Sequence, residues 1–424
     1  MIQQILIKYK EHKKLILNFI FLAINQAVEM FVPLITFRFL IDTIGIEKFG
    51  LLNFVMAFII YFQILIDYGF NNSATRQISL YEHHNKRLNI IVNKVISAKL
   101  YLIGLSTVVY LAVILLIPSF REYFLIYLLY YGVVIGYAFS PSWFFQGMQN
   151  MKNYILINLI SKILALIAII LIISNESEYW IVPLIFSISY IFIAFITTYQ
   201  LFSINKFQFK LNNPKKVISE LNEGKYFFLS ELQATLFTNT NVLILGLFST
   251  LTNVAYFTTA DKLSRSLRNI QIPLSNALYP FLTKKINQNP IDGLKLINKI
   301  TLLGVIITSI ISIILGYLAE YLIVLLFGNK MIEAVEIFKI LLLIPLFSFI
   351  DNMYGKQVLL NLKKDKLFFR IFLFSSIICL ILSLILTYLY DIKGTAIAIG
   401  IGQGILAFNM FYFAQKVVYG KNKN

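Results

Sequence analysis

Long apolar stretches recur along the whole chain and constrain its fold more than any other feature. Residues 15–37, 95–117, 297–318 and 371–388 are each long enough to cross the roughly 30 Å hydrocarbon core of a bilayer as a helix, which takes about 20 residues. With 58% hydrophobic and 13% charged residues, the 424-residue chain has the composition of a membrane protein. Barrel strands alternate apolar and polar residues, so these continuous runs predict helices.

Charged or turn-rich breaks divide the chain into twelve such stretches. They are residues 15–39, 47–72, 92–117, 122–146, 153–174, 179–203, 224–248, 252–282, 297–319, 335–356, 367–389 and 394–416. We therefore predict an all-α polytopic membrane protein with twelve transmembrane helices.

The basic residues are unevenly distributed along the chain. Its formal net charge of +17 is compatible with nucleic-acid binding, but most of the 37 lysines and arginines fall in alternate loops and at the two termini. Lys99, just inside the third stretch, and Lys162, after the fourth, belong to this set. By the positive-inside rule, the pattern predicts that both termini are cytoplasmic and that the helix count is even, with no nucleic-acid partner.

Three cations remain that this topology does not explain. Lys262, Arg265 and Arg268 lie within the eighth stretch, in "ADKLSRSLRNI" (260–270). Each would cost about 2.5 to 3.5 kcal/mol if it faced lipid. Their spacing of three residues confines them to an arc of about 120° on a helix, so they fit one polar face. This face predicts a cationic cavity for an anionic group such as a phosphate, because arginine binds phosphate through a planar fork.

Buried acids offer a competing, purely structural role for these cations. Glu29, Asp67, Glu231, Asp261 and Asp351 all lie in apolar surroundings and could neutralise them. Alternatively, Glu29 could take up H⁺ or Na⁺ and couple transport to an ion gradient. The sequence is compatible with both charge pairing and ion coupling.

Other polar residues in the predicted membrane segments have two interpretations as well. Gln233, Thr238, Asn239 and Asn241 of the seventh stretch could contact sugar hydroxyls or form interhelical hydrogen bonds. Arg76, at the cytoplasmic end of the second stretch, could guide an anionic head group or serve only as a topology charge.

Motifs for an enzyme or a metal site are missing from the sequence. It contains no phosphate-binding GxxxxGK[ST] loop, no HExxH and no nucleophile elbow. The single cysteine, Cys379, lies in an apolar stretch, and His83 and His84 are expected to be solvated loop residues. The sequence therefore gives no support for an enzyme, and we expect no metal and no cofactor.

Short matches recur at an offset of about 205 residues. "IVNKVIS" resembles "LINKITL", and the "KFGLLNF" entry to the second stretch corresponds to "VAYFTTA" at the entry to the eighth. The offset predicts two duplicated six-helix halves, 1–204 and 226–424, which are parallel repeats joined by a cytoplasmic linker, 205–225.

Four blocks carry a resemblance to a known family. "IGIEKFGLLNF" (44–54), "DYGFNNSATR" (67–76), "PSWFFQGMQNMKNY" (141–154) and "ADKLSRSLRNIQIPLSNALYPFLTK" (260–284) resemble O-antigen flippases of the Wzx type. These flippases belong to the multidrug/oligosaccharidyl-lipid/polysaccharide (MOP) exporter superfamily. The resemblance implies two six-helix bundles in a MATE-like arrangement around a central cavity.

The same resemblance implies a substrate and a location. The substrate would be an undecaprenyl-diphosphate-linked oligosaccharide for O-antigen, in lipopolysaccharide biosynthesis, or for a similar surface polysaccharide. It would move from the cytoplasmic to the periplasmic leaflet of the bacterial inner membrane by alternating access. Peptidoglycan-precursor flippases usually carry two further helices, so a polysaccharide repeat is the expected cargo. Membrane lipids, a polysaccharide polymerase and chain-length proteins are the expected partners.

Two other functions remain as alternatives. A multidrug/ion antiporter of the same superfamily would export organic cations, which Lys262, Arg265 and Arg268 would repel. A membrane-embedded glycosyltransferase or ligase would be expected to carry a large polar loop or an acidic catalytic motif.

Overall fold

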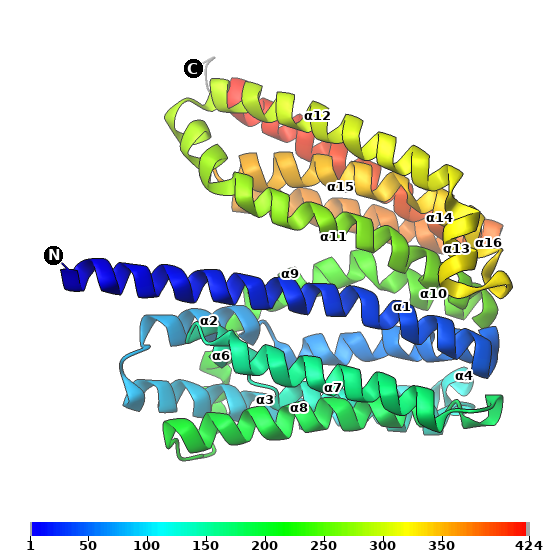
Figure 1. Cartoon of the computed structure of the whole chain (residues 1–424), viewed down its shortest axis with the longest axis horizontal. Coiled ribbons are helices and arrows are strands. Elements are labelled where there is room, and N and C mark those ends of the chain that lie inside the picture. The colour runs from blue at the N-terminus through cyan, green and yellow to red at the C-terminus, as the bar shows by residue number, and fades with distance from the viewer. Residues whose placement is uncertain (1, 421–424) are drawn as a thin grey trace. The chain divides into compact units, whose positions relative to one another are not determined.

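The described part of the chain is entirely helical. The structure, a computed structural model, describes the backbone of residues 2–420 and their side chains except 2–23, 25 and 205 (Figure 1). No strand occurs within 2–420. The all-α class predicted from the apolar stretches is therefore confirmed.

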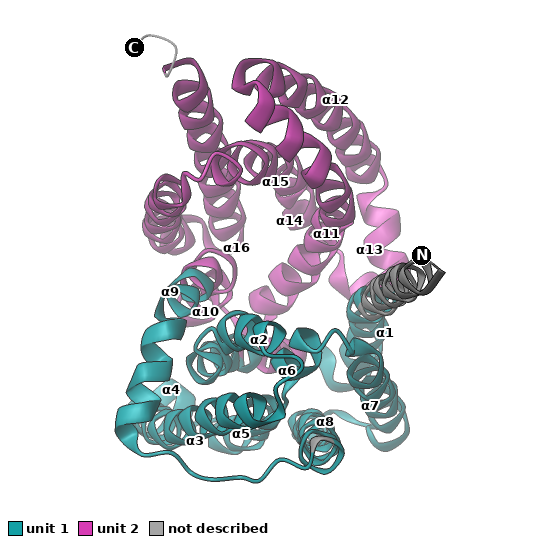
Figure 2. Cartoon of the chain, turned by 90° about the vertical axis from the view of Figure 1, so that its left-hand side faces the viewer, with its two compact units in different colours: residues 1–45, 55–232 teal, residues 46–54, 233–424 magenta. Residues whose placement is uncertain are grey.

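The chain forms two compact units, coloured separately in Figure 2. Unit 1 comprises residues 1–45 and 55–232, and unit 2 comprises 46–54 and 233–424. The helices that lie wholly or mainly in unit 1 are α1 (Ile2–Asp67), α2 (Phe70–Leu80), α3 (Asn85–Leu116), α4 (Pro118–Arg121), α5 (Phe124–Phe139), α6 (Ser142–Gly147), α7 (Met151–Ile172), α8 (Ile181–Asn205) and α9 (Pro214–Thr238). Those of unit 2 are α10 (Thr240–Phe248), α11 (Leu251–Gln288), α12 (Pro290–Tyr317), α13 (Ala319–Phe327), α14 (Ala334–Leu341), α15 (Leu343–Tyr354) and α16 (Asp365–Gly420). Two 3₁₀ turns (Glu176–Glu178, Asn329–Met331) and a π-helical turn (Gly355–Leu360) complete the elements.

Two of the longest helices each contain a sharp kink. In α1 the backbone leaves helical geometry at Gly45, with φ 79° and ψ 165°, and in α16 it does so at Asp391, with φ 54° and ψ −136°. Both sites fall in breaks expected from the sequence, between 39 and 47 and between 389 and 394. Each long helix is therefore two helices joined without an intervening loop.

Seven helical segments of the described chain are long and apolar enough to cross a membrane. They are Gln26–Leu80, Asn85–Leu116, Phe124–Gly147, Met151–Ile172, Glu176–Ile204, Pro290–Tyr317 and Asp365–Gly420. The protein is thus a multi-pass membrane protein. Helix α11 is long but is not among the seven, and it carries four charges between Asp261 and Arg268.

Unit 1 is built around closely packed helices. Gly132 and Gly136 of α5 pack directly on α8, because a Cβ at Gly136 would lie 2.5 Å from the Tyr190 carbonyl carbon and one at Gly132 would lie 2.6 Å from the Ser187 Cβ. Glycine at these two positions therefore permits the close approach of α5 and α8.

The segment between α8 and α9 is bound along α3. The Asn93 side chain donates to Gln208 O at 2.9 Å and accepts from the Lys210 N–H at 3.0 Å. One helical turn further, the Asn212 N–H donates to Ser97 Oγ at 2.9 Å. These side chains satisfy the backbone of an irregular segment that would otherwise lack partners.

A buried carboxylate lies near the start of α9, outside the candidate spans. Gln77 donates to Glu220 at 2.7 Å and to Glu223 at 3.0 Å, and Lys94 Nζ lies 3.7 Å from Glu220. Burial raises the pKa of the Glu220 carboxyl.

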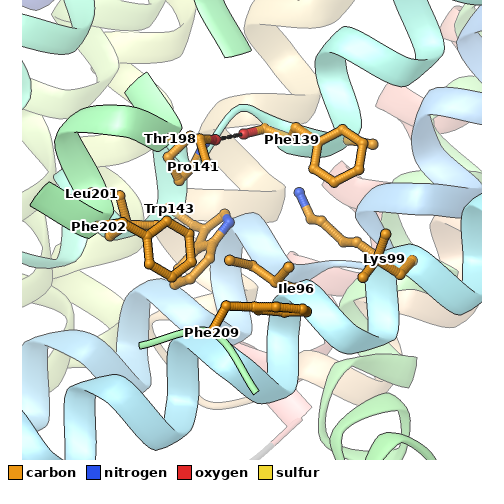
Figure 3. A pocket seen from close by; sticks show the side chains of 11 residues that line it. Ile96, Lys99, Phe139, Pro141, Trp143, Thr198, Leu201, Phe202 and Phe209 are labelled. Atoms are coloured by element: carbon orange, nitrogen blue, oxygen red, sulfur yellow. Dashed lines mark hydrogen bonds between the residues drawn. The ribbon is translucent and has the colours of Figure 1, made fainter. Parts of the chain in front are cut away.

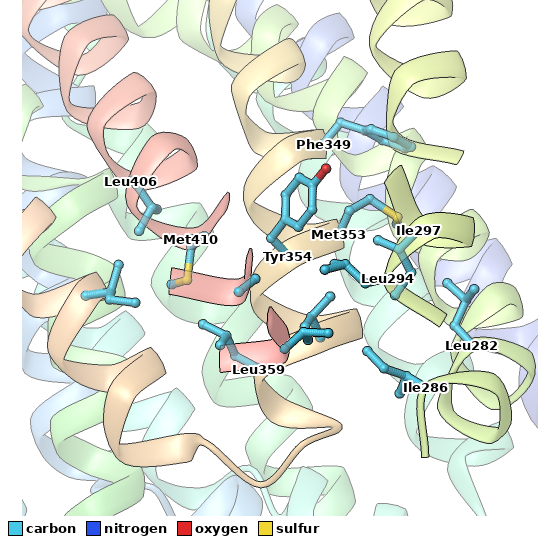
Figure 4. Close-up of a cluster of buried hydrophobic side chains, with 14 of the residues drawn as sticks. Leu282, Ile286, Leu294, Ile297, Phe349, Met353, Tyr354, Leu359, Leu406 and Met410 are labelled. Atoms are coloured by element: carbon cyan, nitrogen blue, oxygen red, sulfur yellow. The ribbon is translucent and has the colours of Figure 1, made fainter. Parts of the chain in front are cut away.

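The core of unit 2 joins α11, α12, α15 and α16. Buried side chains from these helices meet in one cluster, drawn in Figure 4, which includes Leu282, Ile297, Met353 and Met410. This core fixes α11 against its neighbours and so sets the direction in which its charged residues point.

Candidate functional site

The charged segment of α11 contains a tight internal ion pair. Arg265 Nε lies 2.6 Å from Asp261 Oδ2, one helical turn earlier. Asp261 is buried and the Arg265 side chain is 27% exposed. The sequence left open which acid, if any, neutralises Arg265, and within unit 2 the structure assigns Asp261 to it.

A break between two helices supplies a second partner for Arg265. Helix α9 ends at Thr238 and α10 begins at Thr240, so the helical course is interrupted at Asn239. Arg265 Nη2 donates to Thr238 O at 2.6 Å, and the Val242 N–H donates to Asn239 O at 3.2 Å. The guanidinium is thus held by a carboxylate on one side and a helix-end carbonyl on the other, an arrangement suited to its fork of donors.

Arg268 lies one turn beyond Arg265 and has a different environment. Within the part of the chain that the structure describes, no carboxylate is within ion-pair distance of it. Asp351 of α15 acts on it electrostatically from farther away, and the side-chain amide of Gln403 in α16 donates to that carboxylate. Arg268 therefore keeps its donors available for a ligand more fully than Arg265 does.

A second stripe of α11 is polar but uncharged. Ser264 donates to Leu341 O at 2.8 Å, Gln271 donates to Pro345 O at 3.0 Å, and Ser275 donates to the Asn352 side chain at 2.5 Å. These bonds attach α11 to α14 and α15. They fix the rotation of α11 and hence the orientation of its charged stripe.

The polar residues around the break at Asn239 divide into two groups. Gln233 is buried and donates to Phe369 O at 3.4 Å, and Asn241 is buried, donates to Phe237 O and accepts from Ser383 at 2.5 Å. For these two, the structure favours the interhelical alternative. Thr238 and Asn239 are only half-buried and hydrogen-bond to each other at 3.2 Å.

Lys262 and Arg76 lie at positions with more solvent access. Lys262 is half-buried on α11, and its carbonyl accepts from Ser266 at 2.8 Å. Arg76 is exposed on α2, in unit 1.

Glu29, considered above as a coupling carboxylate or a partner of the α11 cations, pairs with a lysine of α7. Its carboxylate accepts from Lys162 Nζ, with side chains 42% and 20% exposed. Lys162 lies well inside α7, so its assignment to a cytoplasmic loop was wrong.

Asp67 and Lys99 form the most deeply buried ion pair among the described residues. Their side chains are 2% and 3% exposed, and Lys99 Nζ lies 3.7 Å from Asp67 Oδ1. From the sequence we assigned Lys99 to the cytoplasmic charges that set the membrane topology. That assignment was wrong, because Lys99 lies on α3 and is buried in the interior of unit 1. In the sequence, the one residue that could have indicated the burial of Lys99 is Asp67, which lies on a different helix. Lys99 and Lys162 therefore join Lys262, Arg265 and Arg268 as cations that the topology rule does not explain.

Glu231, the remaining predicted acid, approaches this pair from α9. It accepts from the Asn72 side chain at 3.0 Å and acts electrostatically on both Asp67 and Lys99. The structure thus brings two of the predicted acids together in unit 1 with a lysine that the sequence analysis had misplaced.

An apolar cavity of about 300 Å³ lies beside Lys99 in unit 1 (Figure 3). Trp143, Phe139 and Phe209 line it together with Lys99. Its walls offer almost no polar surface for a sugar, so it is not the predicted diphosphate site. Among the described residues, no cluster of three or more histidine, cysteine or acidic side chains could hold a metal ion.

These features define a helical multi-pass membrane protein in which a charged helix is packed into the interior of one unit. The family described as "Polysaccharide biosynthesis protein" matches residues 15–286, more than half of the chain. The chain belongs to this family, and the resemblance described above is confirmed.

Known relatives and solved structures agree with this assignment. The chain is 27% identical to a protein of Escherichia coli (strain K12) named "Putative O-antigen transporter" over 94% of this chain and 96% of that protein. It is 25% identical to a protein of the same name from Shigella dysenteriae, over 90% and 95%. An inward-facing multidrug resistance MATE family transporter of the MOP superfamily matches with a TM-score of 0.73 at 12% identity, over 96% of this chain and 99% of that one. The lipid II flippase MurJ, in an inward closed conformation, matches with a TM-score of 0.65 at 17% identity, over 94% and 87%. The two structures establish the fold.

Proposed function

We propose that the protein is a flippase that moves an undecaprenyl-diphosphate-linked oligosaccharide repeat, for O-antigen or a similar surface polysaccharide, to the periplasmic leaflet of the bacterial inner membrane. The names of the two relatives support a transporter of this kind, and the lipid II flippase fold is compatible with a lipid-linked cargo. The proposal includes twelve transmembrane helices in two six-helix bundles, 1–204 and 226–424, a linker at 205–225, and both termini in the cytoplasm.

The proposal rests on one observation: the two arginines of α11 differ in how closely a carboxylate approaches them. Arg265 is held by Asp261 and Thr238 O, whereas Arg268 has a more distant carboxylate, Asp351. A diphosphate carries at least two negative charges and pairs of acceptor oxygens, and a planar guanidinium binds such a pair through two parallel hydrogen bonds. Arg268 would make the direct contact, and Arg265 would keep the segment positively charged.

Thr238 and Asn239 complete the proposed site. They lie at the helix break whose carbonyl holds Arg265. Their half-buried side chains could therefore reach the first sugar when the diphosphate lies at Arg268. Lys262 adds a positive charge on the same helix, and Arg76 would attract the head group at the cytoplasmic surface. Alternating access would let the lipid chain stay in the bilayer, with transport coupled to an H⁺ or Na⁺ gradient.

A multidrug/ion antiporter is the second candidate, because the fold is also that of a MATE family transporter. Such a protein would bind organic cations, and the α11 segment has three basic residues against one acid, Asp261. This electrostatic mismatch favours an anionic cargo.

The test is replacement of the two arginines in the full-length protein in cells. We expect Arg268→Ala to lower surface polysaccharide at least tenfold. The amount of protein in the membrane should stay the same, because this substitution breaks no ion pair. Arg265→Ala should lower both export and abundance, since it leaves Asp261 buried without its cation. Arg121→Ala, at an exposed arginine at the end of α4, is the matched control. Normal polysaccharide output from Arg268→Ala would overturn the assignment of the site.

A further inference from the structure

Three charged groups meet at the end of α1 in unit 1. Asp67 is the last residue of α1, Lys99 comes from α3 and Glu231 from α9. Lys99 pairs with Asp67, and Glu231 acts on both groups electrostatically from beyond ion-pair distance, so the cluster carries one surplus negative charge when all three groups are ionised. A surplus charge among helices that span a membrane is costly unless a further cation joins it.

One carboxylate oxygen of Asp67 is poorly satisfied. Asp67 Oδ2 accepts from the Asn71 N–H at 3.3 Å. Oδ1 is buried and, among the described residues, has no hydrogen bond; its neighbour is Lys99 Nζ at 3.7 Å. At that distance, the charges attract without forming the short hydrogen bond that usually compensates a buried pair. Among the described residues, Oδ1 is therefore a buried acceptor that faces the Lys99 ammonium group beyond hydrogen-bond distance.

The surroundings determine which cation fits this oxygen. Besides Lys99 and Glu231, Asp67 interacts electrostatically with two phenols, Tyr137 of α5 and Tyr154 of α7. Lys99 Nζ also lies 5.9 Å from the Tyr137 ring centroid. A metal ion needs several oxygen ligands and would meet the ammonium group beside Oδ1. A proton needs only the one oxygen.

The helix break next to Asp67 links this cluster to α9. Tyr68 and Gly69 have φ of 46° and 75°, and α2 begins at Phe70. A Cβ at Gly69 would lie 2.5 Å from the Phe227 Cβ and 2.7 Å from the Phe228 N, so the break packs directly on α9. Glu231 lies about one helical turn further along α9, which then continues from unit 1 into unit 2.

We propose that the Asp67–Lys99–Glu231 cluster binds one proton and is the coupling site of the transporter. This inference rests on the function proposed above. The proton binds Asp67 Oδ1 and converts the carboxylate to a neutral acid, so the charge of the cluster changes from −1 to 0. Lys99 keeps its own proton and is left with Glu231 as its only charged partner in the cluster. Proton uptake and release therefore change the force between α3 and α9.

A tryptophan beside Lys99 makes proton binding measurable without any substrate. The chain has two tryptophans, Trp143, which lines the cavity together with Lys99, and Trp180, which is 40% exposed. Figure 3 shows Trp143 and Lys99 lining this cavity. In a Trp180→Phe background, purified full-length protein in lipid nanodiscs should show one pH-dependent transition in Trp143 emission.

Variants of the cluster test whether Asp67 causes that transition. Asp67→Asn alone leaves Lys99 buried without its partner and can fail to fold, so the informative variant is Asp67→Asn with Lys99→Met, which removes both charges. We expect the transition to be lost there. It should move to lower pH in Glu231→Gln, because removal of a nearby negative charge weakens proton binding. Glu29→Gln should leave it unchanged. A wild-type-like transition in the double variant, or none in the Trp180→Phe protein, would overturn the proton site.

Vesicles with an imposed pH gradient separate the coupling role from the proposed function. Transfer of a diphosphate-linked oligosaccharide by the wild-type protein should depend on the gradient, and transfer by the double variant should not. If the wild-type rate ignored the gradient, the coupling role would be wrong. If the wild-type protein showed the Trp143 transition but transferred no diphosphate-linked lipid, the proposed function would fail while the proton site stood.

Discussion

The charged residues inside the helices differ in their partners. Arg265 is bound on two sides, Lys99 is buried against Asp67, and Lys162 pairs with Glu29 at a half-exposed position. Among the described residues, Arg268 has no carboxylate within ion-pair distance, and Asp261 and Asp351 act on it only from farther away. On this ground we propose Arg268 as the cation of α11 that contacts an anionic ligand.

Hydropathy along the chain identified the α11 cations but misplaced Lys99 and Lys162. The α11 cations lie far from any loop, so the positive-inside rule does not explain them. Lys99 and Lys162 lie nearer to basic loops, and their burial depends on acids from other helices, Asp67 and Glu29. A one-dimensional pattern does not contain such contacts, which is why these two sites could not be predicted.

Glu29 provides a prediction at this scale. Its pair with Lys162 joins two candidate membrane spans, so Glu29→Gln leaves the Lys162 ammonium group inside a span without its carboxylate. An uncompensated charge there is costly, and we therefore expect Glu29→Gln to lower membrane abundance and to lower polysaccharide export in proportion, measured by immunoblotting and by surface polysaccharide staining. Normal abundance with lost export would instead assign an ion-coupling role to Glu29. Glu122→Gln, in the short segment between α4 and α5, serves as the control for a neutral surface change.

At the scale of helices, the sequence located the elements but not their internal breaks. The kinks at Gly45 and Asp391 fall in predicted boundaries. The breaks at Gly69 and Asn239 lie inside stretches predicted as continuous helices, 47–72 and 224–248. Both are stabilised by tertiary contacts, Gly69 with α9 and Thr238 O with Arg265, so local propensity could not reveal them.

Two segments that the proposed duplication relates to each other lie in contact within unit 2. Residues 46–54 belong to unit 2, and a Cβ at Gly50 would lie 1.8 Å from Leu251 O and 3.3 Å from Ala255 N. Gly50 and Ala255 lie in the two segments, "KFGLLNF" and "VAYFTTA", that the repeat relates to each other. These two positions, which the proposed repeat makes equivalent, lie close together within unit 2.

A glycine comparison tests the packing of α5 on α8. Gly136→Ala should lower stability by about 1 to 3 kcal/mol, because its Cβ would overlap the backbone at Tyr190 and Ile191. Gly400→Ala is the matched control, because nothing lies within 4 Å of a Cβ there and alanine favours helix by up to about 1 kcal/mol. Thermal unfolding of the purified proteins should show a lower midpoint for Gly136→Ala and an unchanged or higher one for Gly400→Ala. Equal midpoints would contradict the packing described.

At the scale of the whole molecule, the fold and the family are established more firmly than the cargo. Apolar stretches predicted an all-α membrane protein, and solved transporters share its fold over 94% to 96% of this chain. That fold is common to proteins titled as a multidrug transporter and as a lipid II flippase, so it does not select the substrate by itself. The charges of α11 are what favour an anionic, diphosphate-linked cargo.

The most direct test of this central claim is to delete the protein from its native cell and measure diphosphate-linked oligosaccharide in the cytoplasmic leaflet. The account predicts that the lipid-linked repeat accumulates there, that wild-type protein restores export, and that Arg268→Ala does not. No accumulation in the deletion strain, together with altered sensitivity to cationic drugs, would contradict the flippase and favour the antiporter.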